Sequence, residues 1–208
     1  MLQIGAVEPG TLAVLKRLMG IAELKDFYLV GGTVLALRYG HRKPIDVDLF
    51  VSEDSNNEQI AKVLEKTFPA FLYRRLNNPI GLFGYIDDVK VDLVKHHRIL
   101  WLKPCIEWDG TRISCDEDII GMKINAILRR ADKKNFWDSS EFLHHYKLSD
   151  CIGFYHQKFS DQRLEISIPT AITYFDDAED SEDPVSLQDQ TWGSMKKHLQ
   201  KQVRDYLA

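Results

Sequence analysis

The chain has 208 residues, a net charge of −4, a hydrophobic fraction of 44% and a charged fraction of 28%. These values are ordinary for a soluble globular protein and argue against a protein that coats nucleic acid through its overall charge, although a local basic groove is compatible with them. The three cysteines are widely spaced and form no CxxC pair, which indicates reduced thiols rather than a zinc site or a disulfide framework. The N-terminus lacks a signal-peptide pattern and no segment has the apolar length of a membrane span, so the sequence predicts a soluble, cytoplasmic protein without a membrane partner.

In the first half of the chain, the hydrophobic pattern predicts strands interleaved with helices. The expected elements are, in chain order, a helix capped by Thr11 and ending near Gly20, a strand Phe27–Val30, a helix Thr33–Tyr39, a strand Ile45–Val51, a helix capped by Ser55, and a hairpin of strands Leu82–Ile86 and Val89–Val94 with Asp87-Asp88 as its turn. This order corresponds to a mixed sheet with helices packed on it.

In the second half, the periodicity becomes helical. The expected elements are a helix starting at Ser114 or Asp116, a helix from Asn135 to about Tyr146, a helix near Asp150–Phe159, and a closing amphipathic helix capped by Thr191. The acidic segment Asp176–Asp183 is predicted to be a solvated loop. The change of pattern predicts a soft boundary between a core of residues 1–112 and a helical C-terminal subdomain of residues 113–208.

The most informative segment is Phe27–Phe50, where a glycine pair precedes two alternating aspartates. Asp46 and Asp48 project from the same face of a strand, because side chains alternate between faces. Adjacent carboxylates repel unless a cation lies between them, and oxygen ligands at this spacing suit Mg²⁺. Gly31 and Gly32 have no Cβ, so their backbone can approach a phosphate, and the next helix offers its N-terminus to an anion. The alternative is a polar edge strand whose aspartates face water.

A third carboxylate, Asp92, lies on the predicted strand Val89–Val94. If this strand pairs beside Ile45–Val51, three carboxylates meet at one place, where they could hold two divalent ions. The alternative is a surface aspartate on a hairpin.

Several later residues carry weaker signals. Lys123 lies among apolar residues of an amphipathic stretch, which indicates a directed role such as a triphosphate contact; a lysine that reaches past apolar neighbours to water is the alternative. Lys133 and Lys134, which precede Asp138, could contact phosphate or RNA or could form a solvated face. The pairs His96-His97 and His144-His145 are interpreted as structural or surface residues, because adjacent histidines lack the i, i+4 spacing of metal sites on helices. The aromatic residues Tyr28, Tyr39 and Phe136 are interpreted as core residues rather than base-stacking platforms.

Three segments, in order along the chain, resemble one family: GGTVLALRYGHRKPIDVDLF, VKVDLV and DIIGMKINAILRRADKKNFWD. They resemble the nucleotidyltransferases of the AbiEii/AbiGii toxin family, from abortive-infection and type IV toxin–antitoxin systems, within the polymerase-β-like nucleotidyltransferase superfamily. The resemblance runs from about Phe27 to Leu143, and TYFDDAE at Thr173–Glu179 is also similar. It implies an α+β fold with a polymerase-β-like core, a mixed sheet with flanking helices, followed by a mostly helical C-terminal part.

The resemblance also implies site roles. The metal ligands, for two Mg²⁺ ions or for Mn²⁺ in their place, would be Asp46, Asp48 and Asp92. The nucleotide-binding residues would be Gly31, Gly32, Thr33, Arg42 and Lys123. Asp138 matches a late acidic motif associated with activity, so that the implied catalytic set is Asp46, Asp48, Asp92, Lys123 and Asp138. One departure is Pro44, which stands where the family commonly has a serine two residues before the first aspartate; the contact of that hydroxyl would be lost or supplied elsewhere, for example by Thr33.

The expected function is Mg²⁺-dependent transfer of a nucleoside monophosphate from an NTP to an acceptor hydroxyl, with release of pyrophosphate. By resemblance, the acceptor could be a tRNA end, and the protein could act as a toxin that a cognate antitoxin restrains. Two alternatives are open. A nucleotide-binding regulatory protein without catalysis is favoured by Pro44 and disfavoured by the retained carboxylates. A small-molecule transferase of the aminoglycoside type would suit the acidic segment Asp176–Asp183, if that segment borders the site.

Overall fold

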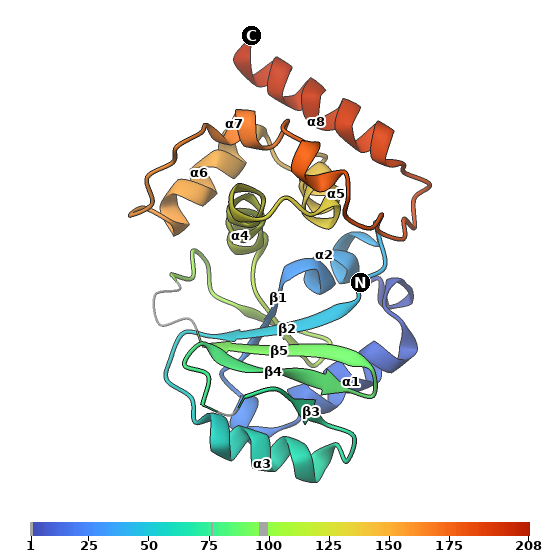
Figure 1. The fold of residues 1–208 in the computed structure, drawn as a ribbon, viewed down its shortest axis with the longest axis vertical. Coiled ribbons are helices and arrows are strands. Elements are labelled where there is room, and N and C mark those ends of the chain that lie inside the picture. Colours follow the sequence, from blue (N-terminus) through green and yellow to red (C-terminus); the bar gives the residue numbers. More distant parts are fainter. Residues whose placement is uncertain (1, 76, 96–99) are drawn as a thin grey trace.

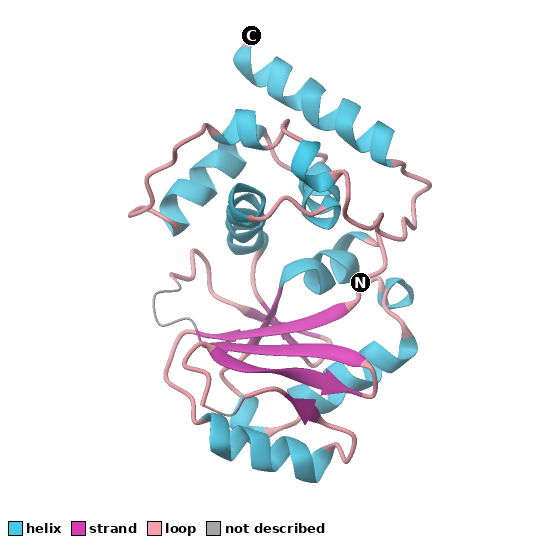
Figure 2. Ribbon diagram, in the orientation of Figure 1, coloured by secondary structure: helices cyan, strands magenta, loops and turns pink. Residues whose placement is uncertain are grey.

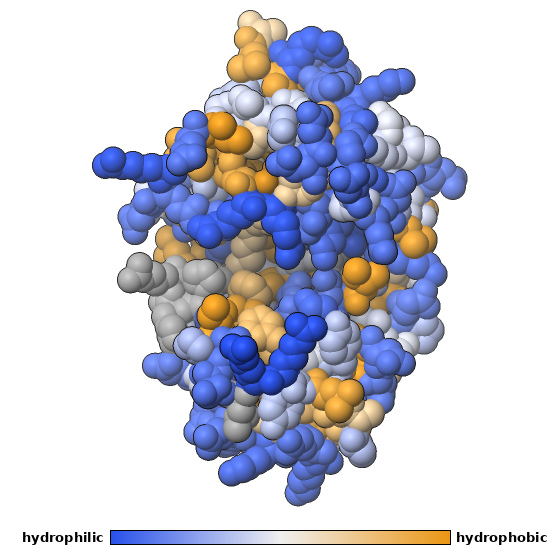
Figure 3. All heavy atoms as spheres, viewed as in Figure 1, coloured by the Kyte–Doolittle hydropathy of each residue, from blue (hydrophilic) through white to orange (hydrophobic). Residues whose placement is uncertain are grey.

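A sheet forms one end of the molecule and a group of helices forms the other (Figures 1 and 2). The computed structural model describes residues 2–75, 77–95 and 100–208, so the pair His96-His97 lies outside the described residues. Hydrophilic side chains cover most of the face drawn in Figure 3, and hydrophobic ones appear there in small groups. Within the described ranges, no helix is long and apolar enough to cross a membrane.

The sheet is mixed, as the sequence predicted. Within the described residues its strand order is β3-β4-β5-β2-β1-β7-β6. The β2–β5 and β1–β7 pairs are parallel, and the other neighbouring pairs are antiparallel. The strands are β1 (Tyr28–Val30), β2 (Asp46–Val51), β3 (Leu72–Tyr73), β4 (Gly81–Ile86), β5 (Val89–Lys95), β6 (Ile106–Trp108) and β7 (Thr111–Ile113).

The hairpin of β4 and β5 is confirmed. Its turn residues Asp87 and Asp88 have φ values of 47° and 65°. Positive φ at both central residues gives the hairpin turn whose twist matches that of the strands, and aspartate adopts this conformation more readily than most residues. The short strands β3, β6 and β7 were not predicted, because two or three residues are too few to display an alternating pattern.

Helices α1 to α3 accompany the sheet, and α4 to α8 form the helical end (Figure 1). Their bounds are α1 (Pro9–Met19), α2 (Gly31–Tyr39), α3 (Asn57–Thr67), α4 (Asp116–Arg129), α5 (Lys133–Phe142), α6 (Leu148–Lys158), α7 (Ile168–Ala171) and α8 (Trp192–Leu207), with 3₁₀ turns at Ile4–Ala6, Ala22–Leu24 and Asp176–Ala178. Thus α2 and α5 begin two residues earlier than predicted, and α5 ends four residues earlier.

Two of the three predicted helix caps are wrong. Thr11 lies inside α1, because Pro9 begins the helix and its fixed φ and missing N–H suit a first turn. Helix α3 is capped by Asn56 rather than Ser55, and the Asn56 side chain accepts hydrogen bonds from two backbone N–H groups of the first turn. Thr191 caps α8 in a reciprocal capping box, as predicted.

Two hydrophobic clusters correspond to the two ends of the molecule. One surrounds the sheet and includes Ile119, and the other lies among α4 to α8 and begins with Ile120. Strand β7 spans the predicted boundary at residue 112. We propose that the change from sheet to helical part falls at the start of α4.

The acidic segment Asp176–Asp183 is mostly exposed, as predicted, but it is anchored at two points. Ala178 in its 3₁₀ turn is buried, and Asp183 lies 2.9 Å from the Lys133 ammonium of α5. The segment therefore lies against the helical part rather than extending freely into water.

The loop between α2 and β2 is held by a segment from far along the chain. The Lys43 N–H donates to the Val185 carbonyl and the Leu187 N–H donates to the His41 carbonyl, both at 2.9 Å. Arg42, which lies between His41 and Lys43, is thereby held at the junction of the sheet and the helical part.

The close packing of α4 on α6 gives a matched pair of glycine variants. Gly153→Ala is expected to raise the free energy of unfolding by about 1 kcal/mol, the usual cost of glycine in a helix interior, because an added Cβ would meet nothing within 4 Å. Gly121→Ala is expected to give no gain or a loss, because its Cβ would lie 3.2 Å from Cδ of Lys158. Urea unfolding measures both, and equal gains would contradict the packing described.

Candidate active site

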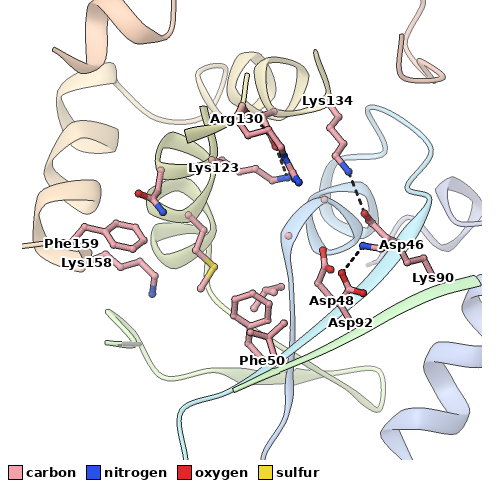
Figure 4. Close-up of a pocket in the computed structure, with 18 of the residues that line it drawn as sticks. Asp46, Asp48, Phe50, Lys90, Asp92, Lys123, Arg130, Lys134, Lys158 and Phe159 are labelled. Atoms are coloured by element: carbon pink, nitrogen blue, oxygen red, sulfur yellow. Dashed lines mark hydrogen bonds and ion pairs between the residues drawn. The ribbon is translucent and has the colours of Figure 1, made fainter. Parts of the chain in front are cut away.

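Three carboxylates meet on neighbouring strands. Asp46 and Asp48 lie on the same face of β2, while the residues between and after them are buried on the other face. In the parallel β2–β5 ladder, Asp48 is directly opposite Asp92. In Figure 4 the three side chains lie together on one side of a cavity. The sequence predicted this cluster of carboxylates only if the two strands pair, and in the structure β2 and β5 do pair.

The carboxylates are crowded, and the crowding changes the pKa of Asp48. Burial, followed by the charges of Asp46 and Asp92, raises the pKa of Asp48 from 3.8 to about 7. Two lysines offset part of the charge: Lys134 Nζ lies 3.3 Å from Asp46 Oδ2, and Lys90 Nζ lies 2.5 Å from Asp92 Oδ2. The other oxygen of Asp92 is buried and has no hydrogen-bond partner among the described residues.

The glycine pair allows side chains to lie close against the backbone. Gly31 has a φ of 75°, which favours glycine, and a Cβ there would lie 3.0 Å from Asp48 Oδ2. A Cβ on Gly32 would overlap the guanidinium of Arg42. The start of α2 can therefore pack against both the carboxylates and Arg42.

Asp138 is completely buried and binds three basic residues. Arg42 donates from Nε to Oδ1 at 2.7 Å and from Nη2 to Oδ2 at 2.8 Å. His41 Nε2 lies 2.8 Å from Oδ1, and Lys123 Nζ lies 2.7 Å from Oδ2. Burial alone would raise the pKa of Asp138, but the charges of Arg42 and Lys123 hold it well below its ordinary value. Asp138 does not line the cavity, and thus it acts on the cavity through Arg42 and Lys123.

The cavity has a volume of about 400 Å³ and lies between the carboxylate strands and helices α4 and α5 (Figure 4). Among the described residues, six basic and three acidic side chains line it: Arg42, Lys90, Lys123, Arg130, Lys134 and Lys158 against Asp46, Asp48 and Asp92. Phe50, Met122 and Phe159 add apolar surface. A pocket of this kind suits an anion with an aromatic or apolar part.

Most of the predicted site residues line this cavity: Gly31, Gly32, Arg42, Asp46, Asp48, Asp92 and Lys123. Thr33 does not. Its hydroxyl is buried and donates to the Asp46 carbonyl at 2.5 Å, which fixes the start of β2 against α2. The Thr33 hydroxyl therefore donates to a backbone carbonyl instead of pointing into the cavity in place of the serine that Pro44 replaces.

Of the two lysines that pair with the carboxylates, sequence reasoning missed Lys90 and named Lys134 only together with Lys133. Lys90 is two residues before Asp92 on the same strand face, a spacing that could have identified it. Lys134 and Lys133 could not be separated by sequence, yet only Lys134 reaches the carboxylates, whereas Lys133 pairs with Asp183. The aromatic candidates lie elsewhere: Tyr28 packs on Trp101, Tyr39 on His145, and Phe136 on Phe175.

The oxygen donors suit a hard divalent cation, but the described residues include no group of three or more His, Cys, Asp or Glu side chains arranged to hold a metal in the present positions. Asp46 and Asp92 are instead paired with Lys134 and Lys90. The unpartnered Asp92 oxygen and the raised pKa of Asp48 are features that a bound cation would relieve. The donor set therefore fits a divalent cation once the lysines withdraw.

A mixed sheet that carries these carboxylates beside a glycine turn, followed by a helical part, is the α+β arrangement that the sequence predicted, with a polymerase-β-like nucleotidyltransferase core. Residues 13–82 match the family model described as "Nucleotidyl transferase AbiEii toxin, Type IV TA system". This match confirms the family resemblance found in the sequence, over the part of the chain that holds the glycine turn and the first two aspartates.

Comparison with other proteins gives one relative in sequence and several in fold. An uncharacterized protein of Aquifex aeolicus (strain VF5) is 28% identical over 199 residues, which cover 93% of this chain and 94% of the relative. JHP933 from Helicobacter pylori has a TM-score of 0.60 and 17% identity, with 93% of this chain and 87% of that chain covered. MenT4, a nucleotidyltransferase toxin of Mycobacterium tuberculosis H37Rv, has a TM-score of 0.57 and 13% identity, with 92% and 87% covered. ANT(2″)-Ia, solved with adenylyl-2″-tobramycin, has a TM-score of 0.55 and 15% identity, with 73% and 98% covered. At these identities the solved structures show a shared fold.

Asp138→Asn is expected to lower the free energy of unfolding by roughly 3–5 kcal/mol, the usual effect of removing one partner of a buried ion pair. The reason is that Arg42 and Lys123 would then be buried without a counter-charge. Asp132→Asn is the control, because its partner Arg130 is 69% exposed and such pairs contribute little. Chemical denaturation of both variants measures the difference, and equal losses would contradict the role of Asp138.

Asp48→Asn is expected to make the metal-free protein more stable at neutral and alkaline pH. Since folding raises the pKa of Asp48 from 3.8 to about 7, the folded state binds a proton more tightly, and stability is lost as the pH rises between these values. Asparagine stays neutral, so the variant should exceed the parent in free energy of unfolding by up to about 4 kcal/mol above pH 7, at about 1.36 kcal/mol for each unit of the pKa shift. The difference should vanish near pH 4.

Thermal unfolding at pH 4, 6 and 8 with a chelator measures this effect. Asp88→Asn, on the exposed hairpin turn, is the control and should show no such trend. A gain for Asp48→Asn that does not change with pH would contradict the proposed cause.

Proposed function

We propose that the protein transfers a nucleoside monophosphate from an NTP to an acceptor hydroxyl, with Asp46, Asp48 and Asp92 holding Mg²⁺. The observation that carries this proposal is the convergence of three carboxylates beside Gly31, in a cavity whose lining is otherwise basic. Carboxylates attract a divalent cation, and the basic lining attracts the triphosphate that accompanies it. Two ions are expected for three carboxylates, and Mn²⁺ has the same ligand preference.

Three basic side chains would bind the triphosphate. Lys123 and Lys134 extend into the cavity from α4 and α5, opposite the carboxylates (Figure 4). Arg42 lies under the glycine turn and is held in place by Asp138. Lys134 now pairs with Asp46, so a cation bound there would free its ammonium group for the phosphates.

The reaction makes a bond between the acceptor oxygen and the α-phosphorus and breaks the bond from that phosphorus to the bridging oxygen, so that pyrophosphate leaves. Bound Mg²⁺ would make the acceptor hydroxyl more acidic and stabilise the charge of the leaving group. Asp92 lines the cavity beside Asp48 and, in this proposal, takes the hydroxyl proton. The basic side chains hold the donor in position and balance its charge.

An RNA acceptor such as a tRNA end, a cognate antitoxin and action in the cytoplasm are further parts of the proposal. They are supported by the description of the matching family as a toxin of a type IV system and by the naming of MenT4 as a nucleotidyltransferase toxin. They rest on likeness to other proteins rather than on contacts in this chain.

Two other functions are less well supported. The fold likeness to ANT(2″)-Ia favours an aminoglycoside-type acceptor, but a basic cavity repels a polycation. A binding protein without catalysis would be consistent with Pro44 in place of serine. However, three clustered carboxylates destabilise the metal-free fold, and a protein with no use for a cation has no physical reason to keep them.

Purified protein incubated with Mg²⁺, each α-labelled NTP in turn and total tRNA is expected to label the RNA, with one base preferred. Asp46→Asn/Asp48→Asn should reduce labelling by more than 100-fold, because the ligands of the metal are removed. Asp88→Asn is the control and should be fully active, since Asp88 lies on the exposed hairpin turn.

Full activity in the double variant would contradict the metal assignment. NTP binding in calorimetry without transfer to RNA or to an aminoglycoside would support the binding-only function instead.

A further inference from the structure

A second cavity lies on the other side of Asp92. It has a volume of about 550 Å³ and is formed by β3, β4, β5 and the start of the loop after β3. It shares only Lys90 and Asp92 with the first cavity, among the described residues that line each. In Figure 1, β4 and β3 lie on the far side of β5 from α4 and α5. The residue proposed to accept the hydroxyl proton is thus reached from two sides.

The strand register places an aromatic surface beside Asp92. Phe83 is opposite Asp92, and Tyr85 is opposite Lys90, so these four side chains share one face of the β4–β5 hairpin. Tyr85 is 43% exposed. Leu72 of β3, which is opposite Tyr85, is 70% exposed and extends the same surface. Exposed aromatic rings on a sheet are the surface on which unpaired nucleobases stack.

The same cavity is positively charged. Among the described residues, three basic side chains line it, Arg74, Arg75 and Lys90, against the one acidic residue Asp92. Arg74 and Arg75 are both exposed, and neither has an ion-pair partner in the described part of the chain. Uncompensated guanidinium groups beside aromatic rings favour phosphates and bases and repel a cationic amino sugar.

The reaction geometry gives the second cavity a role. The attacking and leaving oxygens lie roughly in line across the α-phosphorus, so the acceptor must approach from the side opposite the pyrophosphate. The proposed triphosphate residues Lys123 and Lys134 line only the first cavity. The second cavity contains Asp92 and none of the glycine turn, which leaves it free for the acceptor while the donor is bound.

We propose that this second cavity, the acceptor groove, binds the single-stranded end of an RNA and presents its terminal hydroxyl to Asp92. Tyr85 and Phe83 stack on the last bases, and Arg74 and Arg75 bind the phosphates. The assignment rests on the proposed nucleotidyl transfer and adds to it the place in the fold where the acceptor binds and the residues that select it.

The test measures binding of a fluorescein-labelled single-stranded RNA of twelve nucleotides by anisotropy, over a range of salt concentrations. Arg74→Ala/Arg75→Ala is expected to weaken binding at least tenfold and to make the plot of log K against log salt shallower by about 1.4, at ~0.7 for each single-strand phosphate contact. Lys62→Ala/Lys66→Ala, which removes two exposed charges from α3, should change neither quantity. The affinity for NTP, measured by calorimetry, should be unchanged in both double variants.

Stacking is tested separately. Tyr85→Ala is expected to weaken RNA binding roughly tenfold, whereas Tyr85→Phe should bind like the parent, because a base stacks on the ring and not on the hydroxyl. A duplex RNA of the same length should bind more weakly than the single strand, since paired bases cannot stack on the groove.

Unchanged RNA affinity in the arginine double variant, or equal binding of duplex and single strand, would overturn the proposal. Transfer of label to an aminoglycoside without any RNA binding would also overturn the proposed groove, but it would support the proposed nucleotidyl transfer. RNA binding that depends on Arg74 and Arg75, with no transfer from any NTP, would support the groove and contradict the proposed function.

Discussion

The buried ion cluster around Asp138 is the interaction on which the arrangement of the site depends. Its members come from three places: Asp138 from α5, His41 and Arg42 from the loop before β2, and Lys123 from α4. A buried charge is stable only when it is paired, so these elements can pack together in few ways. The geometry that satisfies Asp138 is also the one that brings Lys123 and Arg42 to face the carboxylates.

Negative and positive side chains lie on opposite sides of the first cavity. The strands supply three carboxylates, and helices α4 and α5 supply Lys123 and Lys134 from the other side. Lys134 and Lys90 now bridge this separation. Under the proposed function, a cation and a polyphosphate that enter together would replace these ion pairs with their own, so the arrangement of charges suits the two bound together better than either alone.

The sequence predicted the local features of the site better than the long-range ones. The alternation of Asp46 and Asp48 and the glycine pair are local patterns, and they were read directly from the chain. The pairing of Asp92 with Asp48 depends on strand register, which no local pattern determines. That Asp138 is buried under Arg42, and that Lys134 rather than Lys133 reaches Asp46, depend on how α5 is rotated against the sheet. The overall fold was predicted because the long elements have clear periods, whereas the strands of two or three residues do not.

The distance along the chain between Arg42 and Asp138 has a consequence for biosynthesis. Asp138 follows its partner by 96 residues, and the segment 185–187 that holds the same loop follows later still. While the chain is on the ribosome, Arg42 has no buried counter-charge, so the loop before β2 cannot settle in its final place. Because a ribosome adds the N-terminal residues first, Asp46 and Asp48 are synthesised well before Asp138 and residues 185–187, which hold the loop beside them. The candidate site would therefore be completed only after residues 185–187 have been synthesised, so the order of synthesis delays its assembly.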